Sequence, residues 1–179
     1  MRSYSFDKTK NEINMENQWS KFRLRVNVKT DMAAAYKAWN TSEALESWFL
    51  RKAVFKDAEG NLKDKKAPIV EGDTYEWFWY GYPDSVVEKG KVLKANGKNV
   101  FSFTFSLECP VTITIYEEAG ETIVELVESD LPTDTETALK YFVGDSRGWI
   151  FYMANLKSIL EGGLDLRNKR MELTNVITS

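Results

Sequence analysis

Residues 98–128 read KNVFSFTFSLECPVTITIYEEAGETIVELVE, and apolar and polar side chains alternate along most of this stretch. Phe101, Phe103 and Phe105 fall on one side of an extended chain, with hydroxyl side chains between them. This period of two is typical of a half-buried strand, because successive side chains of a strand point to opposite faces. The alternation returns in Val111–Ile115 and in Thr122–Glu128. The stretch therefore predicts a meander of antiparallel strands.

Turn signals separate these strands. Asn96-Gly97 predicts a two-residue type I′ hairpin, because both residues tolerate the positive φ angles that this turn requires. It would join Val86–Ala95 to Lys98–Ser106. Residues 109–110, a cysteine followed by a proline, are expected to interrupt the strand ladder, since proline lacks a backbone N–H.

Toward the N-terminus the pattern changes from period two to a helical period and back. We expect a strand at Phe22–Val28, a helix at Met32–Trp39 capped by Thr30, a short helix at Thr41–Leu50 capped by Ser42, and strands at Lys52–Lys56 and Tyr75–Tyr80. With the meander, this makes six or seven strands.

Toward the C-terminus a long helix is expected. Residues 133–136 read TDTE, a capping box in which Thr133 and Glu136 would satisfy the first free amides of a helix. Gly144 and Gly148 suggest a break or kink, after which a helix would continue to a stop at Gly162-Gly163. The whole pattern predicts an α+β helix-grip fold: a curved antiparallel sheet around a long C-terminal helix, with two short helices after the first strand.

Composition limits the function. The 179 residues include 24 Lys and Arg, 27 Asp and Glu and no His, for a net charge of −3. The chain lacks the positive field that nucleic acid binding needs, and it cannot build a His-based triad or metal site. We expect no nucleic acid partner, no metal, no cofactor and no membrane insertion, since no phosphate-binding glycine motif or long apolar segment occurs. The single cysteine, Cys109, is expected to be structural, and a chain without disulfides fits the cytoplasm.

Two further stretches resemble a known family. Gly148-Trp149 followed by LKSILEGGLDLR at 156–167, together with VKT at 28–30, AYKAW at 35–39 and LESWF at 45–49, resembles the START-like (SRPBCC) superfamily. Within it, the chain looks like the branch named for homology to the activator of the heat-shock protein ATPase. The resemblance spans roughly residues 20–167 and implies a helix-grip domain around a cavity, with no catalytic residues that carry over. Residues 1–19 and 168–179 are expected to be extensions of that domain.

Aromatic side chains are the first candidate site. A cavity between sheet and helix would be lined by inward residues of the strands and of the long helix. The candidate ligand-binding residues are Trp39, Trp77, Trp79, Phe101, Phe103, Phe105, Ile113, Trp149, Tyr152, Met153 and Leu156. The alternative for each is simple core packing.

Acidic side chains are the second candidate. The stretch 117–136 carries eight of them and no Lys or Arg, and we interpret it as a solvated face. Glu76, Glu88 and Glu125 fall on predicted strands and are expected on the outer surface. Asp145 with Arg147, and Asp165 with Arg167, are expected to form local ion pairs or caps.

These observations favour a protein that binds a small hydrophobic or aromatic molecule, as carrier or sensor rather than as an enzyme. One alternative is a co-chaperone-like module that binds a protein partner or a second copy of itself, which predicts a large exposed apolar patch. A second alternative is a cyclase, isomerase or hydrolase using the same cavity. It predicts a carboxyl or lysine group in the cavity with a strongly shifted pKa.

Overall fold

The computed structural model describes residues 19–170, 172–173 and 176, so most of the two predicted extensions lies outside the described residues. In chain order the elements are β1 (Phe22–Val28), α2 (Met32–Lys37), α3 (Ser42–Trp48), β2 (Lys52–Lys56), β3 (Thr74–Phe78), β4 (Glu88–Ala95), β5 (Val100–Phe105), β6 (Cys109–Glu118), β7 (Glu121–Glu128) and α4 (Thr135–Leu160). The predicted order of strands and helices is confirmed. No helix in these described ranges is long and apolar enough to cross a bilayer.

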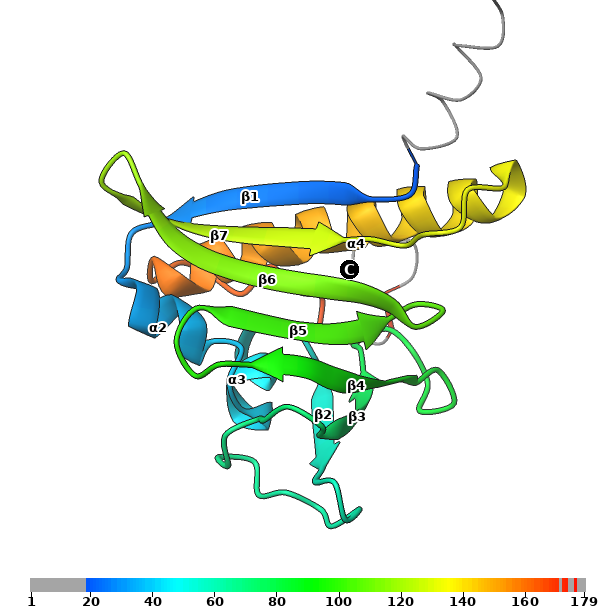
Figure 1. Ribbon diagram of the computed structural model, residues 1–179, viewed down its shortest axis with the longest axis horizontal. Helices are drawn as coiled ribbons and strands as arrows, with labels where there is room; N and C mark the ends of the chain where they lie inside the picture. Colours follow the sequence, from blue (N-terminus) through cyan, green and yellow to red (C-terminus); the bar gives the residue numbers. More distant parts are fainter. Residues whose placement is uncertain (1–18, 171, 174–175, 177–179) are drawn as a thin grey trace, which may run out of the picture.

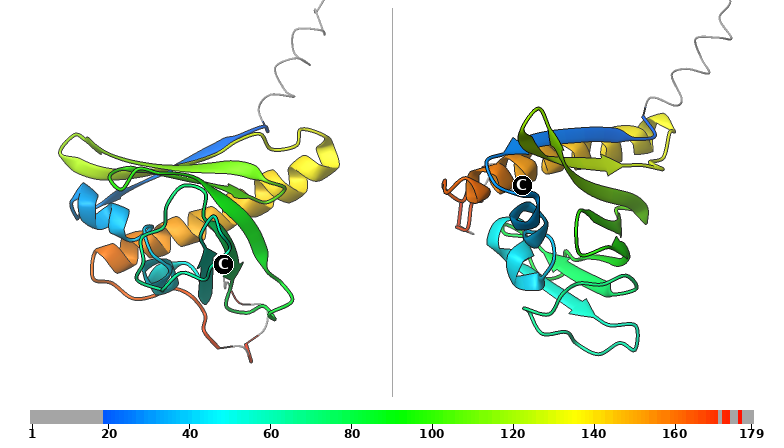
Figure 2. Two further views of the ribbon diagram at one scale, coloured as in Figure 1. Left: turned by 60° about the horizontal axis from the view of Figure 1, so that its bottom comes forward. Right: turned by 60° about the vertical axis from the view of Figure 1, so that its left-hand side comes forward.

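One antiparallel sheet contains all seven strands, in the order β1-β7-β6-β5-β4-β3-β2. The sheet curves, and α4 runs behind β1, β7 and β6, while α2 contacts β6 and β7 and α3 packs against β2 (Figure 1). Figure 2 shows the curvature from the side, with α4 held in the concave face. This is the predicted α+β helix-grip fold.

Inward side chains form rows across the sheet. Phe101 pairs with Ile113, Ile113 with Leu126, and Leu126 with Leu24, so that one apolar row crosses four strands. These rows bury the predicted face of β5, and Phe101 and Phe103 are fully enclosed. At about 25 cal/mol per Å² of apolar surface removed from water, such rows are the main stabilising contribution to the sheet.

The hairpin between β4 and β5 forms where it was predicted, but the predicted type I′ turn is wrong. The Asn96 N–H donates to the Val100 carbonyl at 3.1 Å, so the loop takes in residues 97–99. Within the loop Gly97 has a positive φ of 70°. The Asn96 side chain stabilises this wider loop. Its Oδ1 accepts hydrogen bonds from the backbone N–H groups of Lys98, Asn99 and Val100.

The predicted interruption at Cys109-Pro110 is also wrong, because β6 includes both residues. The Pro110 carbonyl accepts from the Ser129 N–H at 3.1 Å, just beyond the end of β7. The N and C=O of one strand residue point to the same side, so the missing proline N–H faces this strand end and not β5. The chain turns earlier, at residues 106–108, where three consecutive residues have positive φ.

The long helix is continuous through both glycines, which corrects the predicted break. α4 has 26 residues and begins after the N-cap Asp134, one position later than the expected Thr133 cap. The N-caps of α2 and α3 are likewise Asp31 and Thr41, each one residue away from the predicted Thr30 and Ser42. At 1.5 Å per residue α4 is about 39 Å long, enough to cross the whole sheet.

The helix ends at the glycine pair, and the segment after it contains the ion pair, both as predicted. Gly163 N–H donates to the Ser158 carbonyl at 2.7 Å, and Gly162, with a φ of 75°, donates to that of Ile159, a Schellman C-cap. The chain then folds back, and Arg167 forms the expected ion pair with Asp165 at 2.6 Å. Arg167 also donates to the carbonyls of Glu46, Ser47 and Leu50 at the end of α3.

Candidate functional site

A pocket of about 390 Å³ opens between α4 and the strand ends of β3 and β5. We call it the α4 pocket. Its lining residues are Phe49, Trp79, Tyr82, Val86, Phe105, Gly144, Asp145, Arg147, Gly148, Trp149 and Tyr152. Most of this lining is aromatic or has no side chain, so the pocket offers apolar walls around a small polar part.

The helix contributes one face to the pocket. Gly144, Gly148 and Tyr152 are spaced four residues apart and therefore lie above one another on α4, with Asp145 and Trp149 beside them. A Cβ added at Gly144 or Gly148 would meet no atom within 4 Å. Glycine disfavours a helix interior by roughly 0.5–1 kcal/mol relative to alanine, so the two residues leave space on this face at a cost in stability.

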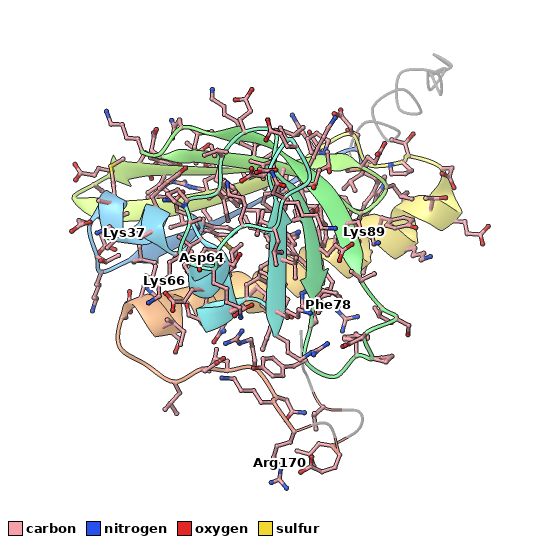
Figure 3. The ribbon with its side chains drawn as sticks, turned by 90° about the horizontal axis from the view of Figure 1, so that it is seen from below. Lys37, Asp64, Lys66, Phe78, Lys89 and Arg170 are labelled. Carbon is pink, nitrogen blue, oxygen red and sulfur yellow. The ribbon has the colours of Figure 1, made fainter. Side chains whose placement is uncertain are left out.

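The opposite wall comes from Phe49 after α3, from Phe105 at the end of β5 and from the loop that follows β3. Figure 3 labels Phe78 before this loop and Lys89 after it. Both residues lie on the side of this view opposite to Lys37 and Lys66. The Phe49 ring lies 5.1 Å from Trp149 and 6.1 Å from Trp79, and Phe105 lies 5.3 Å from Trp149 (centroid to centroid). These spacings are those of edge-to-face and tilted aromatic pairs.

The eleven predicted ligand-binding residues divide into two groups. Four line the α4 pocket: Trp79, Phe105, Trp149 and Tyr152. The other seven lie in the hydrophobic core away from it: Trp39, Trp77, Phe101, Phe103, Ile113, Met153 and Leu156. Ligand binding by the first four stays a prediction, while sequence reasoning missed Phe49 and Tyr82 altogether.

A buried carboxyl group lies behind the aromatic wall. Glu128 stands opposite Phe22 and Val111 in a row of otherwise apolar inward residues, and its exposed fraction is 0%. Its Oε2 accepts a hydrogen bond of 3.0 Å from the Trp149 indole N–H. Its Oε1 has no donor among the residues that the structure describes. Glu128 belongs to the acidic stretch that we expected to be solvated, so that prediction is wrong at this residue.

Asp145 of α4 completes a pair with Glu128. Its Oδ2 is buried and, like Glu128 Oε1, has no donor within the described part of the chain when both groups are ionised. Burial first, and then the neighbouring Asp145 carboxylate, raise the pKa of Glu128 to about 9. Burial also raises the pKa of Asp145, although hydrogen bonds from the Ser106 side chain and from Glu128 oppose the shift. The two groups thus share one proton near neutral pH, which Glu128 donates to Asp145.

The predicted ion pair between Asp145 and Arg147 is not formed, because Asp145 turns toward Glu128 and Ser106. Glu88 corrects a second prediction. It pairs in register with the buried Trp77 and so faces inward, and its burial raises its pKa, opposed by a hydrogen bond from the Ser106 backbone. Glu76 and Glu125 do lie on the outer surface, where they pair with Lys89 and Arg23.

The inward position of Glu128 could have been inferred from the alternation along β7. Val124 and Leu126 are buried on one side of β7, and residue 128 follows at the same period of two. The charge of Glu128 favours the opposite, exposed side, and burial of the strand face outweighs it. The site therefore combines an aromatic surface with a carboxyl–carboxylate pair at its inner end that can hold or release a proton. In the described residues no group of three His, Cys, Asp or Glu is arranged to bind a metal ion.

Comparison with known proteins is informative for the fold. No family model matches the chain, and no curated protein matches it in sequence. Solved structures do match. DynU16, from the dynemicin biosynthetic locus, has a TM-score of 0.63 at 17% identity over 84% of this chain, which corresponds to only 50% of DynU16.

Two smaller proteins match along nearly their whole length. SSP2350 from Staphylococcus saprophyticus has a TM-score of 0.63 at 19% identity, covering 82% of this chain and 96% of its own. The Aha1 dimer structure from Colwellia psychrerythraea has a TM-score of 0.61 at 15% identity, covering 80% and 97%. At these identities the similarity shows a shared helix-grip fold and not a shared function.

Proposed function

We propose that this protein binds a small hydrophobic or aromatic molecule in the α4 pocket and acts as a carrier or sensor. The observation that supports this best is the helix face formed by Gly144 and Gly148. Two glycines in the middle of a 26-residue helix lower its stability, yet a methyl group at either would meet open space. A helix that only filled a core would gain by having side chains there.

The size and chemistry of the pocket agree with this function. A volume of about 390 Å³ lies within the usual range for small-molecule sites, roughly 300–1,000 Å³. Trp79 and Phe105 are only half buried, so their ring surfaces are available to a ligand. Burying these surfaces against an aromatic ring is favourable through both the hydrophobic effect and ring stacking.

Calorimetric titration with 2-naphthylmethanol, a neutral bicyclic alcohol, tests the proposal. We expect binding that weakens about tenfold in Trp79→Ala, because one aromatic wall is removed. Trp19→Ala is the matched control, since Trp19 contacts Phe142 near the start of α4 and lies outside the pocket. No binding at millimolar probe, or equal losses in both variants, would overturn the proposal.

An enzyme using the same pocket is a second candidate, supported by the proton shared between Glu128 and Asp145. Such a pair beside a bound substrate is suited to general acid–base catalysis. The test is to incubate ligand co-purified from the host with fresh protein and follow its mass. Conversion by the unaltered protein but not by Asp145→Asn would favour the enzyme, and an unchanged mass would favour the carrier. The alternative of a protein-interaction module stays a prediction.

A further inference from the structure

The charges around the inner end of the α4 pocket indicate the class of ligand that it would bind. Asp145 of α4 lines this end, Glu128 of β7 and Glu88 of β4 interact with Asp145 from behind it, and every charged group that shifts the pKa values of these three is itself acidic. Arg147 also lines the pocket, but its side chain is exposed to solvent. The inner end is thus acidic, and the described residues supply it with no internal counter-ion.

Two buried oxygens there have no donor of their own. Glu128, with an exposed fraction of 0%, has an Oε1 without a donor among the described residues, and the Oδ2 of its neighbour Asp145 is buried and also lacks one. Burying a polar oxygen without a hydrogen bond is costly, because the oxygen loses its hydration without gaining a donor. A single proton serves both oxygens when the pocket is empty. A ligand with N–H donors and a positive charge would stabilise these oxygens more strongly, because charge-assisted hydrogen bonds are stronger than neutral ones.

We propose that the α4 pocket selects ligands with a protonated amine on a flat apolar body, the amine bound by Asp145, with Glu128 paired to Asp145 from behind, and the body packed against Trp149 and Phe105. This proposal rests on the proposed function and specifies its ligand class. Trp149 links the two parts of the site, since its ring lines the pocket while its N–H holds Glu128 Oε2. Aromatic faces beside a cation add a favourable cation–π contribution.

Proton exchange accompanies this binding mode. As the ammonium group binds to Asp145, the O–H bond of Glu128 breaks and its proton passes to the solvent, so that the cation is matched by Asp145 and by the second carboxylate behind it. Because the raised pKa of Glu128 keeps that proton in place near neutral pH, binding must release up to one proton. The affinity for an amine should therefore rise with pH until Glu128 ionises, while that for a neutral ligand should not.

The experiment compares 2-naphthylmethanol with 2-naphthylmethylamine, which differ only in hydroxyl against ammonium. We expect the amine to bind at least about tenfold more tightly at pH 7.5. Titrations in buffers of different ionisation enthalpy should show release of up to one proton with the amine and none with the alcohol. Asp145→Asn should abolish both the preference and the proton release while retaining the alcohol. Glu128→Gln, a neutral isostere, gives an independent second variant that should also abolish proton release.

Glu76→Gln is the matched control, since Glu76 lies on the outer face and pairs with Lys89. It should leave the preference intact, and an equal loss there would overturn the proposal by showing a non-specific charge effect. Equal affinity for both probes would overturn the amine proposal and leave the proposed function standing. Failure of both probes to bind would overturn the two together.

Discussion

The Trp149 indole N–H donates a 3.0 Å hydrogen bond to Glu128 Oε2, joining a wall of the α4 pocket to a fully buried carboxyl group of β7. The bond favours the ionised form of Glu128, but burial and Asp145 outweigh it and raise the pKa. Glu128 Oε1, in contrast, has no donor among the described residues. Any ligand packed on the Trp149 ring is therefore coupled to the protonation of this pair.

Stability should fall as pH rises through the neutral range. The folded Glu128 keeps its proton up to a pKa of about 9, whereas the unfolded chain releases it near the ordinary value of 4.5. The folded state thus binds more protons between these values, and its advantage is complete below 4.5 and lost as pH rises toward 9. We expect Glu128→Gln, measured by urea denaturation between pH 5.5 and 8.5, to depend less on pH than the unaltered protein.

Glu128→Gln should also gain stability relative to the unaltered protein as the pH rises, by at most about 1.4 kcal/mol per pH unit. The amide oxygen can still accept from Trp149, so the fold is retained. Parallel pH profiles for the two proteins would contradict the assignment of a buried, protonated Glu128.

Gly144→Ala and Gly148→Ala should each stabilise the protein by roughly 0.5–1 kcal/mol. The added methyl groups meet open space, so only the gain in helix propensity remains. Thermal and chemical denaturation measure the effect. A loss of stability in either variant would show that this helix face has no free space.

Gly90→Ala should destabilise the protein by about 1–3 kcal/mol, as overpacking does. Tyr75 stands opposite Gly90, and its hydroxyl donates to the Thr104 carbonyl across it. A Cβ at Gly90 would lie 2.6 Å from the Tyr75 hydroxyl oxygen and 2.7 Å from the Thr104 carbonyl oxygen. The control is Ala95→Gly, in the same strand as Gly90. Gly120→Ala is unsuitable as a control, because Gly120 has a positive φ. A neutral Gly90→Ala would refute this close packing.

Arg167→Ala should cost about 3 kcal/mol or more in the free energy of unfolding, since it removes a buried guanidinium that pairs with Asp165 and donates to three backbone carbonyls. Although burial alone raises the pKa of Asp165, hydrogen bonds from Arg167 and Lys169 lower it overall. The exposed pair of Arg170 with Glu172 provides the comparison: Arg170→Ala should change stability by less than about 0.5 kcal/mol. Similar losses in both variants would contradict a special role for Arg167.

The fold could be predicted because local signals agreed with one another. Alternation at Phe101, Phe103 and Phe105, a nearby hairpin signal and the final glycine pair each pointed to the same architecture. Predictions failed where tertiary contacts outweighed local preference. Gly144 and Gly148 do not break α4, because Trp149, Met153 and Leu156 hold the helix against the sheet.

The site was harder to predict than the fold. Aromatic residues on the inner face were identified, but the division into pocket and core depends on where α4 crosses the sheet, which periodicity does not specify. Glu128 and Glu88 occupy inward positions of their strands, and their charge argued for the outer surface. A buried acid departs from the usual rule that charge is exposed, and such departures are where function is to be sought.

The most direct test of the account is a crystal structure of the protein with 2-naphthylmethanol at saturating concentration, alongside the same titration of Gly148→Leu. We predict ring density in the α4 pocket between Phe105 and Trp149, with the hydroxyl toward Asp145, and loss of binding in the folded Gly148→Leu variant because its side chain fills that space. An empty pocket, or unchanged binding in Gly148→Leu, would contradict the proposal that this cavity is a ligand site.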